Sequence, residues 1–302
     1  MRSLLLVSAL LTLVACPGDR RGEAPEREPD EVAILLVVDD SNSMTAVHEA
    51  LQANFGALLA GLEDADAAWR IGVTTVDMQQ VGNGRRGGLR SRSPVGENHC
   101  DPVFASSTEE NPALTYADLV DLGVEGTGQE AGLLSAVWAL CKAQEAEFWD
   151  TLADRGVGDP VRTFCDEIPA EERTCNRGFL FDGGDVGVLI VSDEGDFSND
   201  LSSSNAADYV AALQELGSDV TVTVVGPTYR EGPLDCDGTE LDLQGPCNAF
   251  GSPAASIDRY QDVACGADGT YAPVEVTASG DPQLCEPADF EQILGDFARS
   301  LF

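Results

Sequence analysis

The sequence predicts an α/β protein with a doubly wound, mainly parallel sheet that carries helices on both faces. Two continuous apolar runs, 33–38 and 186–191, are typical of central strands that are buried on both sides. Segments with apolar residues at helical spacing follow the expected strands. Because strands that alternate with helices favour parallel pairing, the order of the elements supports the same fold class.

The expected elements run through residues 32–302, with disulfide-bearing insertions in the loops. The expected strands are 33–38, 69–76, 186–191 and 220–225. The expected helices are 44–63, 129–152, 205–216 and 288–301. Residues 79–116 are rich in Gly, Arg, Ser and Pro and are expected to be mostly loop, and 232–252 is expected to be a Cys- and Gly-bearing insertion.

The chain is strongly acidic, and this argues against several classes of partner. Its 302 residues include 53 acidic and 17 basic side chains, which give a formal net charge of −36. Nucleic-acid binding needs a basic surface to meet phosphate, and anionic lipid headgroups repel an acidic one. The hydrophobic fraction of 43% is nevertheless high enough for a packed core.

The N-terminal segment predicts export. Arg2 precedes an apolar run, 4–14, that is too short for a membrane-spanning helix. The run ends in Leu-Val-Ala-Cys, which resembles the signal of bacterial lipoproteins, whose cysteine is lipidated. Residues 1–15 would then be the signal peptide, and 16–31 would be the lipidated Cys16 and a disordered tether. We expect a lipid anchor in the bacterial cell envelope, at the outer membrane or cell surface. The alternative is an ordinary secretory signal with an incidental cysteine.

The cysteine count agrees with export. Nine cysteines are present, and eight remain when Cys16 is set aside. An even number in an exported chain favours disulfides over metal thiolates, and the sequence has no C-x-x-C pair. Eight cysteines allow many pairings, so the sequence leaves the connectivity open. Short loops favour the pairs Cys165–Cys175, Cys236–Cys247 and Cys265–Cys285, which would leave Cys100–Cys141.

Oxygen-bearing side chains follow the expected strands at the places where the strands end. Asp39, Ser41 and Ser43 form a D-x-S-x-S motif directly after the first strand. Asp193 ends the strand at 186–191, and Thr127 lies just before an expected helix. Because ligand sites in parallel sheets lie at the carboxyl ends of the strands, these side chains are expected at one edge. Hydroxyl and carboxylate oxygens are ligands suited to Mg²⁺ or Ca²⁺.

Together these motifs resemble the metal-ion-dependent adhesion site of the von Willebrand factor type A (VWA) domain. That family combines an apolar strand and D-x-S-x-S with a loop threonine and a later strand-terminal aspartate. Asp193 stands in SDEGDFS, where many members have T-D-G. The resemblance covers about residues 32–302, implies a Rossmann-like VWA fold, and extends to exported bacterial members that are lipoproteins with extra cysteines.

The resemblance also implies how the site would work. The ion would be Mg²⁺ or Ca²⁺, with Mn²⁺ as a further candidate, and its residues would be Asp39, Ser41, Ser43, Thr127 and Asp193. Few carboxylates would touch the ion, so it would keep a positive charge and an open position for a carboxylate of a protein or surface polymer. The alternatives are that the two serines only cap a helix and that the threonine is an ordinary loop hydroxyl. Asp40 is expected to be a solvated neighbour.

Three further groups of charged residues carry weaker signals. The acids within 193–200 would hold a second Ca²⁺ or form a solvated acidic loop. A partial calcium-loop pattern, without the full EF-hand spacing, comprises Asp235, Asp237 and Asp242. A basic island would meet an acidic partner or glycan, or would be solvated; its members are Arg85, Arg86, Arg90 and Arg92.

Enzyme motifs are poorly represented, so we expect a protein that is not an enzyme. The only histidines are His48 and His99, without ligand spacing, and neither G-x-S-x-G nor a Walker motif is present. The G-x-G-x-x-G spacing at 82–87 lies in a loop and opens no helix. Phosphatases of the haloacid dehalogenase type need a second aspartate two residues after the first, where this chain has Ser41 or Asn42.

The expected function is therefore a non-enzymatic envelope lipoprotein that binds a divalent cation and, through the ion, a protein or surface-polymer ligand. Two alternatives remain open: a metal-stabilised envelope scaffold whose ion meets no partner, and a metal-dependent hydrolase.

Overall fold

The structure is a computed structural model that describes residues 30–80, 83–91, 100–123, 126–127, 130–198, 204–227, 236, 254–277 and 285–302. The predicted signal peptide, the lipidated Cys16 and most of the tether lie outside these residues. So do His99, Arg92 and nearly all of the insertion at 232–252.

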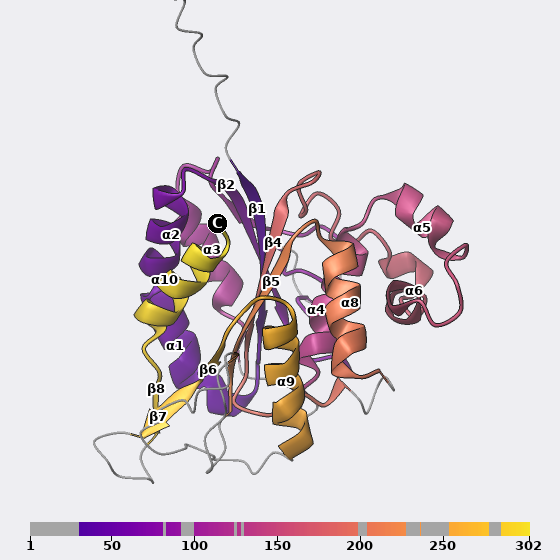
Figure 1. Ribbon diagram of the computed structural model, residues 1–302. Helices are drawn as coiled ribbons and strands as arrows, with labels where there is room; N and C mark the ends of the chain where they lie inside the picture. Colours follow the sequence, from indigo (N-terminus) through magenta and orange to yellow (C-terminus); the bar gives the residue numbers. More distant parts are fainter. Residues whose placement is uncertain are drawn as a thin grey trace, which may run out of the picture.

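A six-stranded sheet forms the centre of the molecule (Figure 1), with the strand order β3-β2-β1-β4-β5-β6. The strands are β1 (Glu31–Val38), β2 (Ala68–Thr75), β3 (Ala105–Ser106), β4 (Asp185–Val191), β5 (Val220–Gly226) and β6 (Tyr271–Pro273). All neighbouring strands pair in parallel except β2 and β3. A separate two-stranded sheet pairs β7 (Glu275–Thr277) with β8 (Cys285–Pro287). The predicted doubly wound, mainly parallel sheet is confirmed.

The central strand β1 owes its place to its apolar run. It pairs with β2 on one side and β4 on the other, and residues 32–38 are all fully buried. Alternate side chains of the strand enter opposite cores, so Ile34 packs on one face of the sheet and Leu35 on the other. Each such side chain contributes on the order of 1.5–3 kcal/mol through its removal from water. This burial fixes the position of the polar residues that follow Val38.

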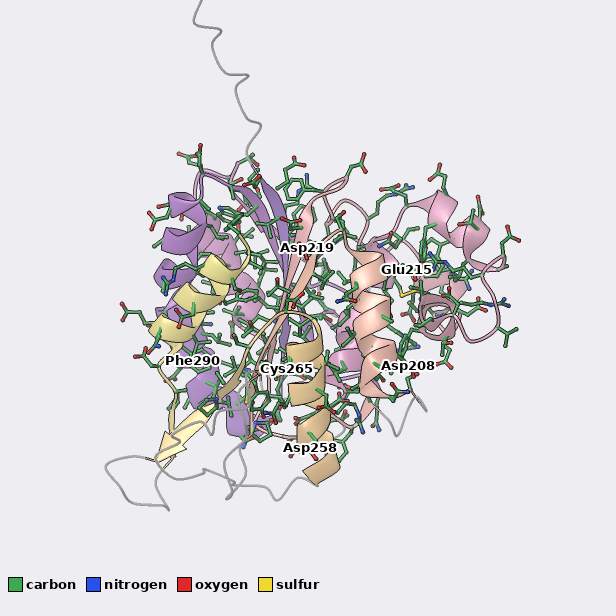
Figure 2. The ribbon with its side chains drawn as sticks, in the orientation of Figure 1. Asp208, Glu215, Asp219, Asp258, Cys265 and Phe290 are labelled. Atoms are coloured by element: carbon green, nitrogen blue, oxygen red, sulfur yellow. A yellow bond between two sulfur atoms is a disulfide. The ribbon has the colours of Figure 1, made fainter. Side chains whose placement is uncertain are left out.

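Helices cover both faces of the sheet (Figure 1). One face carries α1 (Thr45–Ala53), α2 (Phe55–Asp64), α3 (Pro112–Val120) and α10 (Phe290–Ser300). The other carries α4 (Gly132–Ala143), α6 (Pro160–Cys165), α8 (Ala206–Leu216) and α9 (Ala254–Gly266), with α5 (Ala146–Leu152) beside them. Many acids point outward; Figure 2 labels Glu215, Asp219 and Asp258, which are exposed.

The structure changes several predicted boundaries. The helix predicted at 44–63 is interrupted at Asn54, whose side-chain amide donates to the carbonyl of Ala50 at 2.8 Å, and it continues as α2. The helix predicted at 129–152 is broken where Gln144 adopts an extended backbone conformation between α4 and α5. The segment 79–116, predicted to be mostly loop, also contains the short strand β3 and the beginning of α3. The helices α6 and α9 and the strand β6 were not predicted.

Three disulfides join cysteines of the described residues, and their pairing differs from the predicted one. They are Cys100–Cys175, Cys141–Cys165 and Cys236–Cys265. The predicted pairs Cys165–Cys175, Cys100–Cys141, Cys236–Cys247 and Cys265–Cys285 are therefore wrong. Closeness in sequence misled the prediction, because α4 and α6 pack side by side and bring two cysteines 24 residues apart into contact. Disulfides persist in oxidising compartments, so they fit an exported chain. Within the described ranges, no helix has the length and apolar character needed to cross a membrane.

Candidate metal centre

Five acidic side chains lie at one edge of the sheet, four of them directly after the carboxyl ends of three adjacent strands. Asp39 and Asp40 follow β1, Asp77 follows β2 and Asp193 follows β4, while Glu130 lies just before α4. All five are at least nine-tenths buried. Uncompensated buried carboxylates are costly, so this edge requires protons or cations for balance.

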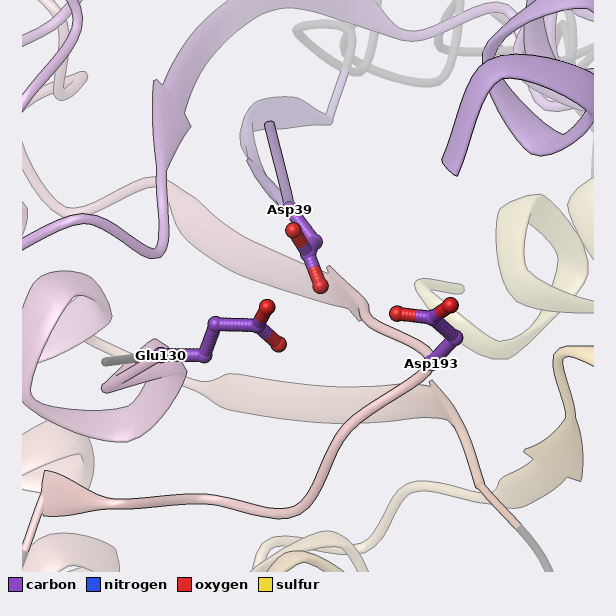
Figure 3. Close-up of side chains that lie close together, drawn as sticks. All are labelled: Asp39, Glu130 and Asp193. Atoms are coloured by element: carbon purple, nitrogen blue, oxygen red, sulfur yellow. The ribbon is translucent and has the colours of Figure 1, made fainter. Parts of the chain in front are cut away.

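Three of these acids form a compact cluster, which we call the acidic triad: Asp39, Glu130 and Asp193 (Figure 3). One carboxylate oxygen from each lies within 4.8 Å of the others, and the figure shows the three side chains pointing toward one another. Asp39 and Glu130 are fully buried and Asp193 is 9% exposed. At an effective dielectric constant of 20, two unit charges at about 4 Å repel by about 4 kcal/mol. The triad is therefore unstable as three carboxylates unless a cation lies among them.

Ser192 connects two members of the triad. Its hydroxyl oxygen lies 3.0 Å from Oδ2 of Asp39 and 2.7 Å from Oε2 of Glu130. A hydroxyl has one hydrogen, so it can donate to only one of the two carboxylates at a time. The other Glu130 oxygen, Oε1, is buried without a hydrogen-bond partner. The protein's own donors thus leave the triad incompletely satisfied.

The protonation of Glu130 reflects this environment. Burial, followed by the effect of the neighbouring Asp39 carboxyl, raises the pKa of Glu130 to about 12. Burial and Asp39 also raise the pKa of Glu194, which is half-buried beside the triad. Without a cation, Glu130 would hold a proton at neutral pH. A bound cation would favour the ionised form and release that proton.

The D-x-S-x-S segment forms a tight turn around Asp39. The backbone N–H of Ser41 donates to Oδ1 of Asp39 at 2.7 Å, and the hydroxyls of Ser41 and Ser43 lie 2.9 Å apart. Ser41 makes no side-chain capping bond to the 3₁₀ turn Asn42–Met44 that it precedes. Hydroxyls that face each other beside a carboxylate fit the metal interpretation better than the capping one.

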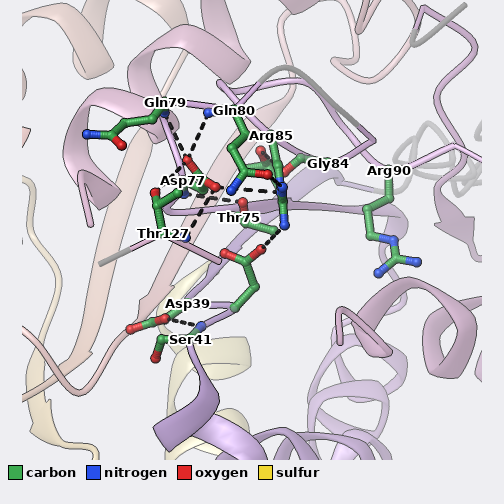
Figure 4. Close-up of polar contacts among 12 residues, drawn as sticks. Asp39, Ser41, Thr75, Asp77, Gln79, Gln80, Gly84, Arg85, Arg90 and Thr127 are labelled. Carbon is green, nitrogen blue, oxygen red and sulfur yellow. Dashed lines mark hydrogen bonds and ion pairs between the residues drawn. The ribbon is translucent and has the colours of Figure 1, made fainter. Parts of the chain in front are cut away.

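Thr127 belongs to a second network next to the triad (Figure 4). Its hydroxyl donates to Oδ1 of Asp77 at 3.0 Å, and its backbone N–H donates to Oδ2 at 3.4 Å. Arg85 lies 3.1 Å from Oδ2 of Asp40 and 3.7 Å from Oδ2 of Asp77. Asp40 is therefore not a solvated neighbour, as predicted, but a buried partner of an arginine. Burial raises the pKa of Asp40, and Arg85 opposes that rise.

The arginines of the predicted basic island turn toward this chain's own groups. Arg86 lies 3.2 Å from Glu172, and the guanidinium of Arg90 donates to the carbonyl of Asp121 at 2.6 Å. Arg85 pairs with Asp40 and Asp77. The solvated-loop interpretation is therefore wrong for Arg85, Arg86 and Arg90. Arg92 is outside the described residues.

The predicted acidic loop after β4 is also largely internal. Asp196 is 1% exposed, lies 2.8 Å from Arg259 and accepts the backbone N–H of Leu133 at 3.2 Å. A solvated loop is therefore wrong for Asp196. Residues 199–200 and the acids Asp235, Asp237 and Asp242 lie outside the described residues.

The structure thus brings Asp39 and Asp193 together and keeps Ser41 and Ser43 beside Asp39, while Thr127 bonds to Asp77. Sequence reasoning missed Glu130, Asp77 and Ser192. Asp77 directly follows a predicted strand, so the rule that located Asp39 would also have found it. Glu130 follows no strand, and although Thr127, three residues before it, was predicted as a site residue, the predicted motif contains no acidic residue at the position of Glu130.

No protein-family model and no curated protein sequence matches this chain. A solved von Willebrand factor type A protein from Catenulispora acidiphila is similar over 90% of this chain and 43% of its own, with 12% sequence identity and a TM-score of 0.41. The pilus adhesin SpaC from Lactobacillus rhamnosus GG, in an open conformation, is similar over 91% of this chain and 30% of its own, with 9% identity and a TM-score of 0.43. This chain spans less than half the length of either.

The strand order and parallel pairing define a Rossmann-like doubly wound fold, and the D-x-S-x-S turn lies directly after its central strand, as the resemblance to the VWA domain implied. At the edge of its sheet lies an acidic triad that could hold a divalent cation.

Proposed function

We propose that this protein is a non-enzymatic, lipid-anchored component of the bacterial cell envelope that binds a divalent cation at the acidic triad. The single observation that carries the proposal is the convergence of buried carboxylate oxygens of Asp39, Glu130 and Asp193 within 4.8 Å. The anchor would be Cys16, and the disulfides support an exported location.

The donor set fits a hard cation. The triad and the adjacent hydroxyls of Ser41 and Ser43 offer only oxygen atoms, the ligands preferred by Mg²⁺, Ca²⁺ and Mn²⁺. Oε1 of Glu130 accepts no hydrogen bond from the protein, so this oxygen is available to coordinate the cation. When bound, the ion would supply positive charge and a coordination position for an external oxygen ligand.

The ligand of the loaded site would be a protein or a surface polymer that offers a carboxylate. A carboxylate on a divalent cation makes a charge-assisted contact. The net charge of −36 repels a broadly acidic partner, so a single local acid is the favoured ligand. The second candidate is a metal-stabilised scaffold, which the nearly complete burial of the triad favours.

Calorimetric titration of the full chain with Mg²⁺, Ca²⁺ and Mn²⁺ tests the cation site. We expect one ion to bind, and Asp39→Ala to abolish binding. Asp150→Asn, which removes one exposed acid on α5, is the matched control and should bind as the wild type does. Unchanged affinity in Asp39→Ala would refute the site. Capture of envelope components with and without EDTA then separates the two candidates: EDTA abolishes capture by an ion-dependent binding protein and leaves a scaffold's capture unchanged.

A further inference from the structure

Glu130 is the member of the triad that has no counterpart in the D-x-S-x-S, threonine and aspartate pattern. We propose that Glu130 is a resident carboxylate ligand of the cation, which takes the coordination position of a partner's carboxylate and must be displaced before that partner binds. This inference rests on the proposed function, because it concerns the same cation.

The backbone of Glu130 is fixed from two sides. Its carbonyl accepts the N–H of Phe197 at 2.7 Å, and the N–H of the next residue, Ala131, donates to the carbonyl of Val76 at 3.0 Å. Glu130 also forms an isolated antiparallel bridge with Asp77. The main chain is therefore held between the end of β2 and the loop after β4, and the side-chain torsions are the freedom that remains for moving the carboxylate.

The side chain is poised to bind an ion. Glu130 is fully buried, its Oε2 meets the shared hydroxyl of Ser192, and its Oε1 has no hydrogen-bond partner. Figure 3 shows its carboxylate turned toward those of Asp39 and Asp193. A buried oxygen that lacks a hydrogen-bond partner and faces two other carboxylates has the position expected of a ligand to a bound ion.

Formal charge decides what the loaded site can accept. A divalent cation together with the carboxylates of Asp39 and Asp193 has no net charge, so an incoming carboxylate meets no net repulsion. With the Glu130 carboxylate added, the site carries one negative charge and repels an anion. An intramolecular carboxylate also acts at a high effective concentration, on the order of millimolar or more, against which a partner must compete.

The chain offers a matched control for this charge argument. Glu194 lies two residues after Ser192, is half-buried and feels the Asp39 charge, but it is not a member of the triad. Glu194→Gln removes the same charge from the same neighbourhood as Glu130→Gln. A difference between the two variants therefore reports ligation rather than net charge.

The test ion is Mn²⁺, and the relaxation rate of water protons reports how many water molecules coordinate it. Acetate is the carboxylate probe. Compared with the wild type, Mn²⁺-loaded Glu130→Gln should bind the ion about tenfold more weakly, the equivalent of about 1.4 kcal/mol. Its relaxivity per bound ion should be higher, because solvent takes the vacated position. Acetate should lower that relaxivity at about tenfold lower concentration than in the wild type. Glu194→Gln should keep wild-type relaxivity and acetate response.

Equal relaxivity and acetate response in Glu130→Gln and Glu194→Gln would overturn the inference while leaving the cation site intact. Absence of Mn²⁺ binding in the wild type would instead overturn the proposed function. If Glu130→Gln fails to fold, Glu130→Asp carries the test, because it keeps the charge but withdraws the carboxylate by one methylene. It should also show higher relaxivity, and a wild-type value would count against ligation.

Discussion

The hydroxyl of Thr127 donates a hydrogen bond to the carboxylate of Asp77 at 3.0 Å and so ties the loop before α4 to the end of β2. Asp77 is fully buried and also accepts the backbone N–H of Gln79 at 2.8 Å. Arg85, which Figure 4 shows near Asp77, also pairs with Asp40, the residue that follows Asp39. The threonine predicted as a metal residue is thus attached to the cation site through a buried polar network.

Thr127→Ser and Thr127→Val separate the hydroxyl from the shape of the side chain. Serine keeps the bond to Asp77, so its effect on stability and cation affinity should be small. Valine is close in shape but cannot donate, and it should lower the free energy of unfolding by about 1–2 kcal/mol because a buried carboxylate loses a donor. Chemical denaturation and Mn²⁺ titration measure both effects. Equal behaviour of the two variants would show that the bond is unimportant.

The stability of the cation-free protein should fall as pH rises. Burial raises the pKa of Glu130 to about 12 from 4.5, and burial also raises the pKa values of Asp40 and Glu194. Above about pH 5 the unfolded chain has released the Glu130 proton while the folded chain retains it, and the raised pKa values of Asp40 and Glu194 act in the same direction, so the free energy of unfolding falls with pH. One such group contributes up to about 1.4 kcal/mol per pH unit.

Thermal unfolding in EDTA from about pH 5 to about pH 8 measures this decline. Millimolar Ca²⁺ should flatten it, because the ion replaces the proton on Glu130. A melting temperature in EDTA that stays constant or rises over this interval would contradict the raised pKa values.

Two glycines of α2 should respond to alanine in opposite directions. A Cβ at Gly61 would lie 2.5 Å from Cβ of Ala298 in α10, whereas a Cβ at Gly56 would meet no atom within 4 Å. Gly61→Ala should cost about 1–3 kcal/mol through overpacking, and Gly56→Ala should gain about 0.5–1 kcal/mol from helix propensity. Chemical denaturation checks both.

Ala298→Gly removes the Cβ atom that an alanine at position 61 would contact, and so tests the overpacking directly. Added to Gly61→Ala, it should recover part of the loss, because it removes the atom that the new Cβ meets. Equal effects at Gly61 and Gly56 would show that α2 and α10, which lie side by side in Figure 1, do not pack this closely.

The central sheet could be predicted because its strands are buried on both faces. The run at 33–38 has no polar residue, so only its ends were uncertain, and β1 extends from Glu31 to Val38. The helix boundaries could not be predicted from local periodicity, because they depend on contacts between segments that are far apart in the sequence. α2 begins anew after Asn54 and packs on α10, which lies more than 200 residues later.

The site was predicted in part for the same reason. Asp39 and Asp193 follow apolar strands, and parallel pairing places the ends of β1 and β4 next to each other. Glu130 is brought to them by a non-local bridge to Asp77 and by the loop after β4. The disulfide between Cys141 and Cys165 likewise depends on how helices pack, which cysteine spacing does not encode.

The most direct test of the central claim is a crystal of the full chain soaked in Mn²⁺ and analysed by anomalous scattering. We predict one peak among Asp39, Glu130 and Asp193, with carboxylate oxygens of all three at about 2.0–2.6 Å from the ion. A soaked crystal without a peak in the triad, or with the ion bound elsewhere while Glu130 remains hydrogen-bonded to Ser192 alone, would contradict the account.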